Sequence, residues 1–131
     1  MATIKMFEEI TSWQEARKLN QLMGDLIDSG KLKNNFRLIN QIEGSAGSIM
    51  DNIAEGFERN GNSEFKQFLY ISKGSCGELR SQLFRALDRD YITQEEFDTI
   101  SSCALKVSRL IQGLISYLTN TEQKGPKYKS R

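Results

Sequence analysis

The stretch FDTISSCALKVSRLIQGLISYL, residues 97–118, decides the fold class. Its apolar residues recur at alternating spacings of three and four, which puts them on one stripe of an α-helix and makes a sustained a/d seam. Thr93 and Glu96 stand just before it in the order of a capping box, so this helix is expected to begin near Thr93. The members of the stripe are Phe97, Ile100, Ala104, Val107, Ile111, Leu114 and Leu118.

Residues 63–90 repeat the same spacing and predict a second long helix. At about 1.5 Å per residue such a helix is roughly 42 Å long, and it requires partners of similar length. Its seam consists of Phe65, Leu69, Ser72, Cys76, Leu79, Leu83 and Ala86.

Two earlier segments complete the pattern. Residues 35–58 carry an apolar stripe that contains Ile42, Ile49 and Ile53, with Gly44 and Gly47 beside it. Since each glycine costs roughly 1 kcal/mol in a helix, we expect the backbone to approach a neighbouring helix closely there. Residues 12–29 have a broader apolar face, and Ser12 with Glu15 three residues later predicts a capping pair at their start.

These segments predict an all-α protein, an antiparallel up-down-up-down four-helix bundle with left-handed packing. The helices are expected at about 12–29, 35–58, 63–90 and 93–120, joined by short connectors. Pro126 is the single proline, so the helical segments contain none. We expect one domain over residues 1–121 and a basic flexible tail over residues 122–131.

The residue types present argue against an enzyme. Histidine is absent, which removes the commonest general base and the usual nitrogen ligand of zinc or iron. Asp51, Glu55, Glu58 and Glu78 could approach one another in a bundle, but a di-iron site requires Glu-x-x-His motifs. We therefore expect no catalytic residue, metal, cofactor or small-molecule substrate; a metal-dependent enzyme that uses these carboxylates is the remaining alternative.

The distribution of charge and hydropathy bears on partners and location. The formal net charge is +1, but the tail alone carries +3, so residues 1–121 carry −2. A folded part of that charge is poorly suited to a broad phosphate-binding surface. No apolar run is long enough to span a membrane and the N-terminus does not read as a secretory signal, so we expect a cytoplasmic protein without a membrane partner.

Two kinds of polar row follow from the helical wheel. In the second segment Ser48, Asn52, Glu55 and Arg59 share one face, and the third segment has a matching row that contains Ser75 and Glu78. Their small and uncharged members favour a packed polar contact over a solvated surface. A separate row of cations could instead contact nucleic acid together with the tail, although a solvated surface is the alternative. These candidate nucleic-acid contacts are Lys66, Lys73, Arg80, Lys124, Lys127 and Lys129.

The apolar residues exceed what one four-helix core requires. A surplus of this kind predicts a subunit interface, with scattered exposed side chains as the alternative. The surplus residues are Leu22, Leu110, Ile115 and Tyr117 of the first and last segments, and Tyr70 and Phe84 of the third.

Residues 48–83, SIMDNIAEGFERNGNSEFKQFLYISKGSCGELRSQL, resemble the signature of the four helix bundle family that includes the 23S rRNA-intervening-sequence protein. The resemblance implies a homopentameric ring with an RNA-associated or scaffolding role. As an alternative, it implies a nucleic-acid-binding accessory protein of the reverse transcriptase in a diversity-generating retroelement. No catalytic residue is implied. The matching positions are Ser48-Ile49, Asn52 to Gly56, Arg59, Ser63, Phe65, Phe68-Leu69, Gly74-Ser75 and Glu78-Leu79.

This sequence departs from that family at one place. Members commonly have arginines shortly after the glutamine of the second helix, where this chain reads Gln41-Ile42-Glu43-Gly44-Ser45. The missing cations weaken the expectation that this chain binds RNA as the reverse-transcriptase accessories do.

Overall fold

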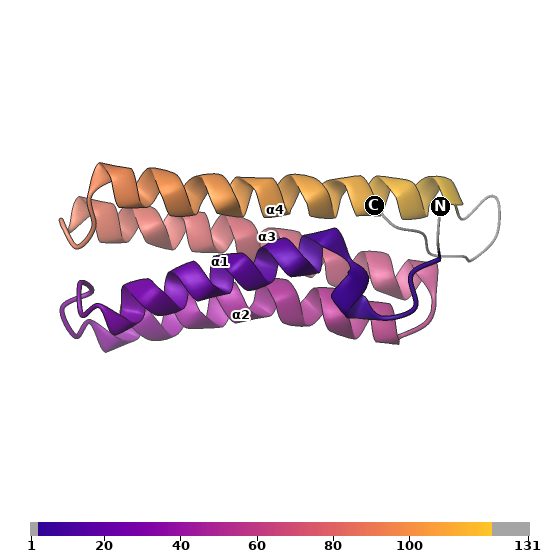
Figure 1. Ribbon diagram of the computed structural model, residues 1–131, viewed down its shortest axis with the longest axis horizontal. Helices are drawn as coiled ribbons and strands as arrows, with labels where there is room; N and C mark the ends of the chain where they lie inside the picture. The colour runs from indigo at the N-terminus through magenta and orange to yellow at the C-terminus, as the bar shows by residue number, and fades with distance from the viewer. Residues whose placement is uncertain (1–2, 122–131) are drawn as a thin grey trace.

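Four long helices run side by side in alternating directions in the computed structural model, which describes residues 3–121 (Figure 1). A short 3-10 helix η1 (Phe7–Glu9) leads into α1 (Thr11–Asp28), α2 (Phe36–Glu58), α3 (Asn62–Asp88) and α4 (Gln94–Thr121). The elements of the described part are all helical, so the predicted all-α class is confirmed. The basic tail over residues 122–131, with its candidate contacts Lys124, Lys127 and Lys129, lies outside the described residues.

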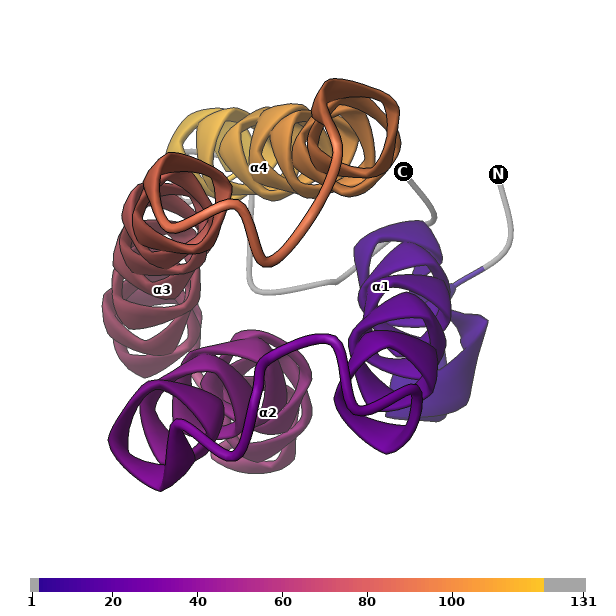
Figure 2. The same cartoon turned by 90° about the vertical axis from the view of Figure 1, so that its left-hand side faces the viewer.

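The helices close into a square when viewed along the bundle (Figure 2). Each helix packs against its neighbour in sequence, and α1 also packs against α4, whereas within residues 3–121 the diagonal pairs do not touch. The pair α2 and α3 is the most extensively packed, and α1 with α4 is the least. The predicted four-helix bundle is confirmed.

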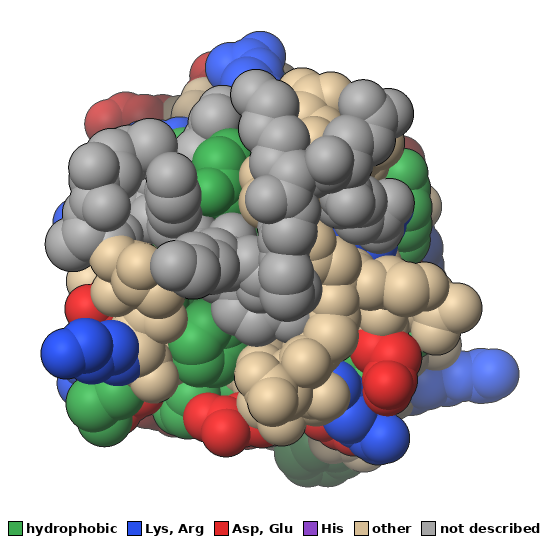
Figure 3. All heavy atoms as spheres, turned by 90° about the vertical axis from the view of Figure 1, so that its right-hand side faces the viewer, with side chains coloured by type: hydrophobic (Ala, Val, Ile, Leu, Met, Phe, Trp, Pro, Cys, Tyr) green, Lys and Arg blue, Asp and Glu red, His purple; other side chains and the backbone are tan. Residues whose placement is uncertain are grey.

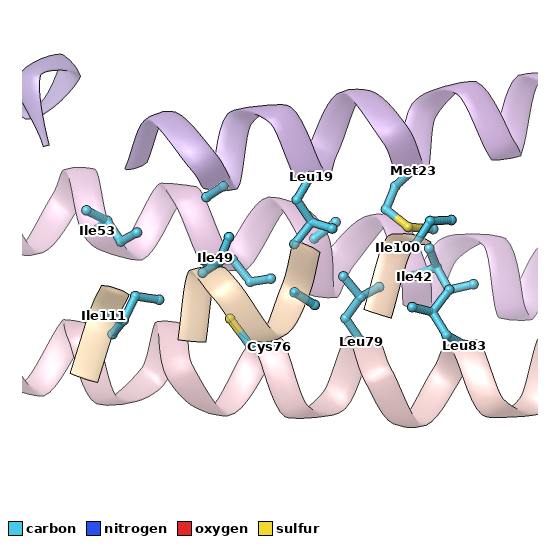
Figure 4. Close-up of a cluster of buried hydrophobic side chains, with 14 of the residues drawn as sticks. Leu19, Met23, Ile42, Ile49, Ile53, Cys76, Leu79, Leu83, Ile100 and Ile111 are labelled. Atoms are coloured by element: carbon cyan, nitrogen blue, oxygen red, sulfur yellow. The ribbon is translucent and has the colours of Figure 1, made fainter. Parts of the chain in front are cut away.

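The core lies along the bundle axis and consists of the predicted seams. All seven seam residues of α3 and all seven of α4 are buried. Figure 4 shows how Leu19 and Met23 of α1, Ile42 and Ile49 of α2 and Leu79 of α3 point toward one another across this core. Because the interior is filled along its length by aliphatic side chains, the hydrophobic effect holds the four helices together.

One predicted helix start is confirmed and another is wrong. The Thr93 N–H donates to Glu96 Oε1 at 2.8 Å and the Glu96 N–H donates to Thr93 Oγ at 3.1 Å, which is the predicted capping box. By contrast α1 starts at Thr11, and its N-cap residue Ile10 makes no side-chain hydrogen bond. Ser12 and Ile10 are buried, so the chain enters α1 through packing of an apolar residue rather than through a polar cap.

Left-handed backbone conformations end three of the helices. Gly30 follows α1 with φ 78°, Asn60 follows α2 with φ 64° and Asp90 follows α3 with φ 60°. Glycine adopts this region without a steric penalty, and Asn and Asp tolerate it better than other residues. The short connectors therefore come from residues suited to reversing the chain.

The close helix approach expected at Gly44 and Gly47 is wrong. A Cβ added at Gly44 would have no neighbour within 4 Å, and one at Gly47 would meet only an Asp51 carboxylate oxygen at 3.9 Å. The close approach occurs at Gly56, where a Cβ would lie 2.6 Å from Phe68 Cβ. Gly44 and Gly47 lie on parts of α2 that face away from α3 and α1.

Candidate interaction surface on α3

The face of α3 that points away from the core exposes large apolar side chains. On the helical wheel Tyr70, Gly74, Gly77, Ser81 and Phe84 lie opposite the buried seam, and Ile71 lies beside them. Tyr70 is 57% exposed, Ile71 53% and Phe84 48%. We call these six residues the α3 outer face. Exposed apolar side chains gathered on one helix face are typical of an interaction surface rather than of scattered surface residues.

The middle of the α3 outer face is free of side chains. A Cβ added at Gly74 or Gly77 would have no atom within 4 Å, so the helix backbone there is open to an approaching partner. Phe84 at one end is held in place because its ring lies 4.6 Å from the ring of Phe97 on α4, tilted by 53°. The result is a shallow backbone strip between two aromatic side chains, into which the side chains of another helix fit.

The predicted polar rows meet within the chain, in the contact between α2 and α3 that we call the α2–α3 seam. Ser75 Oγ donates to Ser48 Oγ at 2.9 Å, and Asn52 Nδ2 also donates to Ser48 Oγ at 2.9 Å. Ser45 Oγ donates to Glu78 Oε1 at 3.1 Å. These hydrogen bonds use the short side chains of the rows to satisfy polar groups between two closely packed helices.

The end of the α2–α3 seam depends on Gly56 and Arg59. Gly56 lies against Phe65 and Phe68, and Arg59 stacks over the Phe68 ring with its guanidinium carbon 5.2 Å from the ring centre. Arg59 Nη2 also donates to Glu55 Oε2 at 2.9 Å, and this ion pair raises the pKa of Arg59. The motif positions of this helix end therefore have a structural use inside one chain.

The basic row of α3 runs beside α4 rather than over the α3 outer face. Lys66, Lys73 and Arg80 are all half-buried, and Lys73 Nζ donates to Gln112 Oε1 of α4 at 2.7 Å. Their heptad spacing puts neighbouring cations about 10 Å apart along the helix. At the end of the bundle where α3 begins, Figure 3 shows Lys and Arg side chains interspersed with Asp and Glu rather than a patch of one sign.

The predicted surplus of apolar residues is partly wrong. Ile115 is only 2% exposed and belongs to the core, because α1 and α3 both contact α4 over a wide arc. Leu22, Leu110 and Tyr117 are half-buried along the same helices. Tyr70 and Phe84 are the members that the structure leaves exposed, and Ile71, which sequence reasoning missed, joins them. Its position on the wheel, three residues before Gly74, was the available signal.

The model of the 23S rRNA-intervening sequence protein family matches residues 8–113 of the chain. The chain belongs to this family. The match covers all of α2 and α3, so the α3 outer face and the α2–α3 seam both lie within it.

A solved structure shares the fold of this family member. It is a protein of unknown function from the S23 ribosomal protein family of Bacteroides thetaiotaomicron, with 21% sequence identity and a TM-score of 0.73. The alignment covers 80% of this chain and 98% of that one. None of the curated proteins compared with the chain matches it.

The chemical groups of this family member fit binding better than catalysis. Burial raises the pKa of the Cys76 thiol to about 12, so it is not a nucleophile near neutral pH. Among residues 3–121 no three Cys, Asp or Glu side chains converge as metal ligands, and Asp51, Glu55, Glu58 and Glu78 are not brought together in that way. Within the same residues no helix has both the length and the apolar composition that crossing a bilayer requires.

Proposed function

We propose that this protein is a non-enzymatic, homo-oligomeric scaffold with an RNA-associated role, and that its copies join through the α3 outer face. The observation that carries this proposal is the exposure of Tyr70, Ile71 and Phe84 around an open strip of backbone. Full burial of one such side chain contributes about 1.5–3 kcal/mol. Because each is already about half covered, docking would contribute roughly half of that per side chain.

The glycines of the α3 outer face support the same proposal. A glycine inside a helix costs roughly 1 kcal/mol relative to alanine, and neither Gly74 nor Gly77 has an atom nearby in the single chain that would clash with a Cβ. A second copy that packs its side chains onto this strip would make use of the missing Cβ atoms. The cost to the isolated helix is then offset in the assembly.

Five copies is the number that the family resemblance implies, and we propose a pentamer. A five-membered ring uses heterologous contacts, in which two different surfaces of the chain meet. The α3 outer face would then be one of the two surfaces. The RNA-associated role is supported by the family description and by the basic row beside α4.

Light scattering behind size exclusion tests the assembly. We expect the full chain at micromolar concentration to show several times its monomer mass of 15.0 kDa. Ile71→Glu should reduce the mass to that of one chain, because it puts a charge into the contact without touching the core. Phe36→Glu is the matched control, since Phe36 is 68% exposed but lies at the start of α2, and it should leave the mass unchanged. A wild-type monomer would overturn the proposal.

The second candidate function is that of a nucleic-acid-binding accessory protein of a reverse transcriptase in a diversity-generating retroelement. It is favoured by the straight row of Lys66, Lys73 and Arg80 along α3. Replacing all three with alanine should weaken RNA or DNA binding and reduce the dependence on salt by about 0.9 logarithmic units per lost phosphate contact on duplex DNA.

The control for this second function replaces three exposed cations at the far end of the bundle, Lys5 being excluded because it lies at the near end. Alanine at Lys33, Arg37 and Arg89 should leave nucleic-acid binding and its salt dependence close to those of the wild type. Equal binding by the row variant and the wild type would remove this candidate.

A further inference from the structure

The bundle has a groove between the end of α1 and the start of α4, and we propose that it binds the basic C-terminal segment, residues 122–131, of another copy. The groove has a volume of about 590 Å³. We call it the α1–α4 groove and define it by three apolar residues, Leu22, Leu26 and Ile100, and three acidic residues, Asp25, Glu95 and Glu96.

The groove combines an apolar floor with free negative charge. Leu26 and Ile100 are buried at its base, and Leu22 is half-buried. Glu96 already pairs with Lys31, whose hydrogen bond lowers the pKa of that carboxyl. Asp25 and Glu95 are exposed and have no ion-pair partner among residues 3–121. An occupant that fits must therefore bring both an apolar group and positive charge.

The C-terminal segment has this composition. It reads EQKGPKYKSR, in which Tyr128 stands between Lys127 and Lys129 and the net charge is +3. A tyrosine ring supplies apolar contact area with few rotatable bonds. With Tyr128 over Leu22 and Ile100, the flanking lysines would lie near the two unpaired carboxylates of the groove.

The length of the segment indicates that it comes from another copy. Ile100 lies 21 residues before Thr121, which is about 32 Å along α4. From Thr121 to Tyr128 the chain spans at most about 25 Å even when fully extended. The segment of the same chain is therefore too short to place its tyrosine in the groove. The inference rests on the proposed self-assembly only in that copies of the chain must meet.

A peptide titration tests this docking with the full-length protein. The protein carries Lys127→Glu and Lys129→Glu so that its own tail does not compete, and the probe is a fluorescent peptide of residues 122–131. We expect saturable binding that weakens about tenfold when Asp25→Asn and Glu95→Gln are added, since two surface charge pairs are lost. The matched control pair, Asp51→Asn and Glu58→Gln on the outside of α2, should leave the affinity unchanged.

The outcomes separate this inference from the proposed assembly. A peptide with Tyr128→Ser should bind more weakly to the same protein, and a protein that also carries Ile71→Glu should still bind the peptide as a monomer. Absence of binding at millimolar peptide would overturn the inference. So would an equal loss of affinity in both carboxylate pairs, which would indicate general charge attraction.

Discussion

The α2–α3 seam and the contact between α1 and α4 join pairs of helices in different ways. In the α2–α3 seam, Gly56 lets the backbones approach and short hydroxyl and amide side chains hydrogen-bond across the contact. Between α1 and α4, long charged side chains make the links: Glu15 pairs with Lys106, and Lys31 pairs with Glu96. The first pair packs extensively and the second leaves a groove.

The difference shows where the molecule can respond to its surroundings. Tight packing between neutral groups depends on shape and is insensitive to pH and salt, whereas surface ion pairs are screened by salt and vary with protonation. The α2–α3 seam therefore serves as the rigid half that supports the α3 outer face. The α1–α4 contact is the half in which an incoming charged segment can find partners.

Gly56→Ala should give the largest effect on stability. Its Cβ would lie 2.6 Å from Phe68 Cβ and 3.3 Å from the Phe65 carbonyl oxygen, so α2 and α3 must move apart. Overpacking of this kind costs about 1–3 kcal/mol in the free energy of unfolding, measured by urea denaturation. Gly44→Ala on the same helix is the control, and it should raise the free energy of unfolding by up to about 1 kcal/mol. Equal effects at the two positions would contradict the assigned contact.

Glu15→Gln should have a smaller effect that depends on pH. Hydrogen bonds from Lys106 and Lys18 lower the pKa of the Glu15 carboxyl below its ordinary value of 4.5. The carboxylate therefore stabilises the fold fully above pH 4.5, and this contribution is lost as the pH falls through the lower, folded-state pKa. At pH 7 the variant should be less stable by up to about 1 kcal/mol. Urea denaturation should show the difference disappearing in acid; a difference that persists there would contradict the ion-pair explanation.

Lys31→Met should have the smallest effect. The pair with Glu96 is partly exposed, and such pairs contribute between zero and about 1 kcal/mol. Glu96 keeps its capping bond with Thr93, so α4 should still begin at the same residue. Thermal denaturation at low and high salt would check this, because the small difference between wild type and variant should vanish at high salt. A large loss at both salt concentrations would mean that the pair also orders the connector.

Sequence periodicity predicted the seams well because burial on a helix repeats every three or four residues. The seven seam positions of α4 and the cap formed by Thr93 and Glu96 depend only on neighbours within one helix. For the same reason the polar rows could be grouped by face, although the pattern did not give the individual partners, such as Ser48 with Ser75.

The features that sequence reasoning missed depend on where helices lie relative to each other. Gly44 and Gly56 look alike in sequence, and only the packing of α3 shows which one has a close neighbour. Ile115 was assigned to the surface because the width of the buried arc of α4 depends on two partners. The α1–α4 groove likewise arises from the separation of two helices, which no local pattern records.

Photo-crosslinking from the α3 outer face is the most direct test of the central claim that this face joins copies of the chain. The photoreactive residue p-benzoylphenylalanine would replace Tyr70 in one protein and Phe36 in another, since both side chains are exposed aromatics. We predict covalently linked copies from position 70 and single chains from position 36. Single chains from position 70, or equal crosslinking from both positions, would contradict the account.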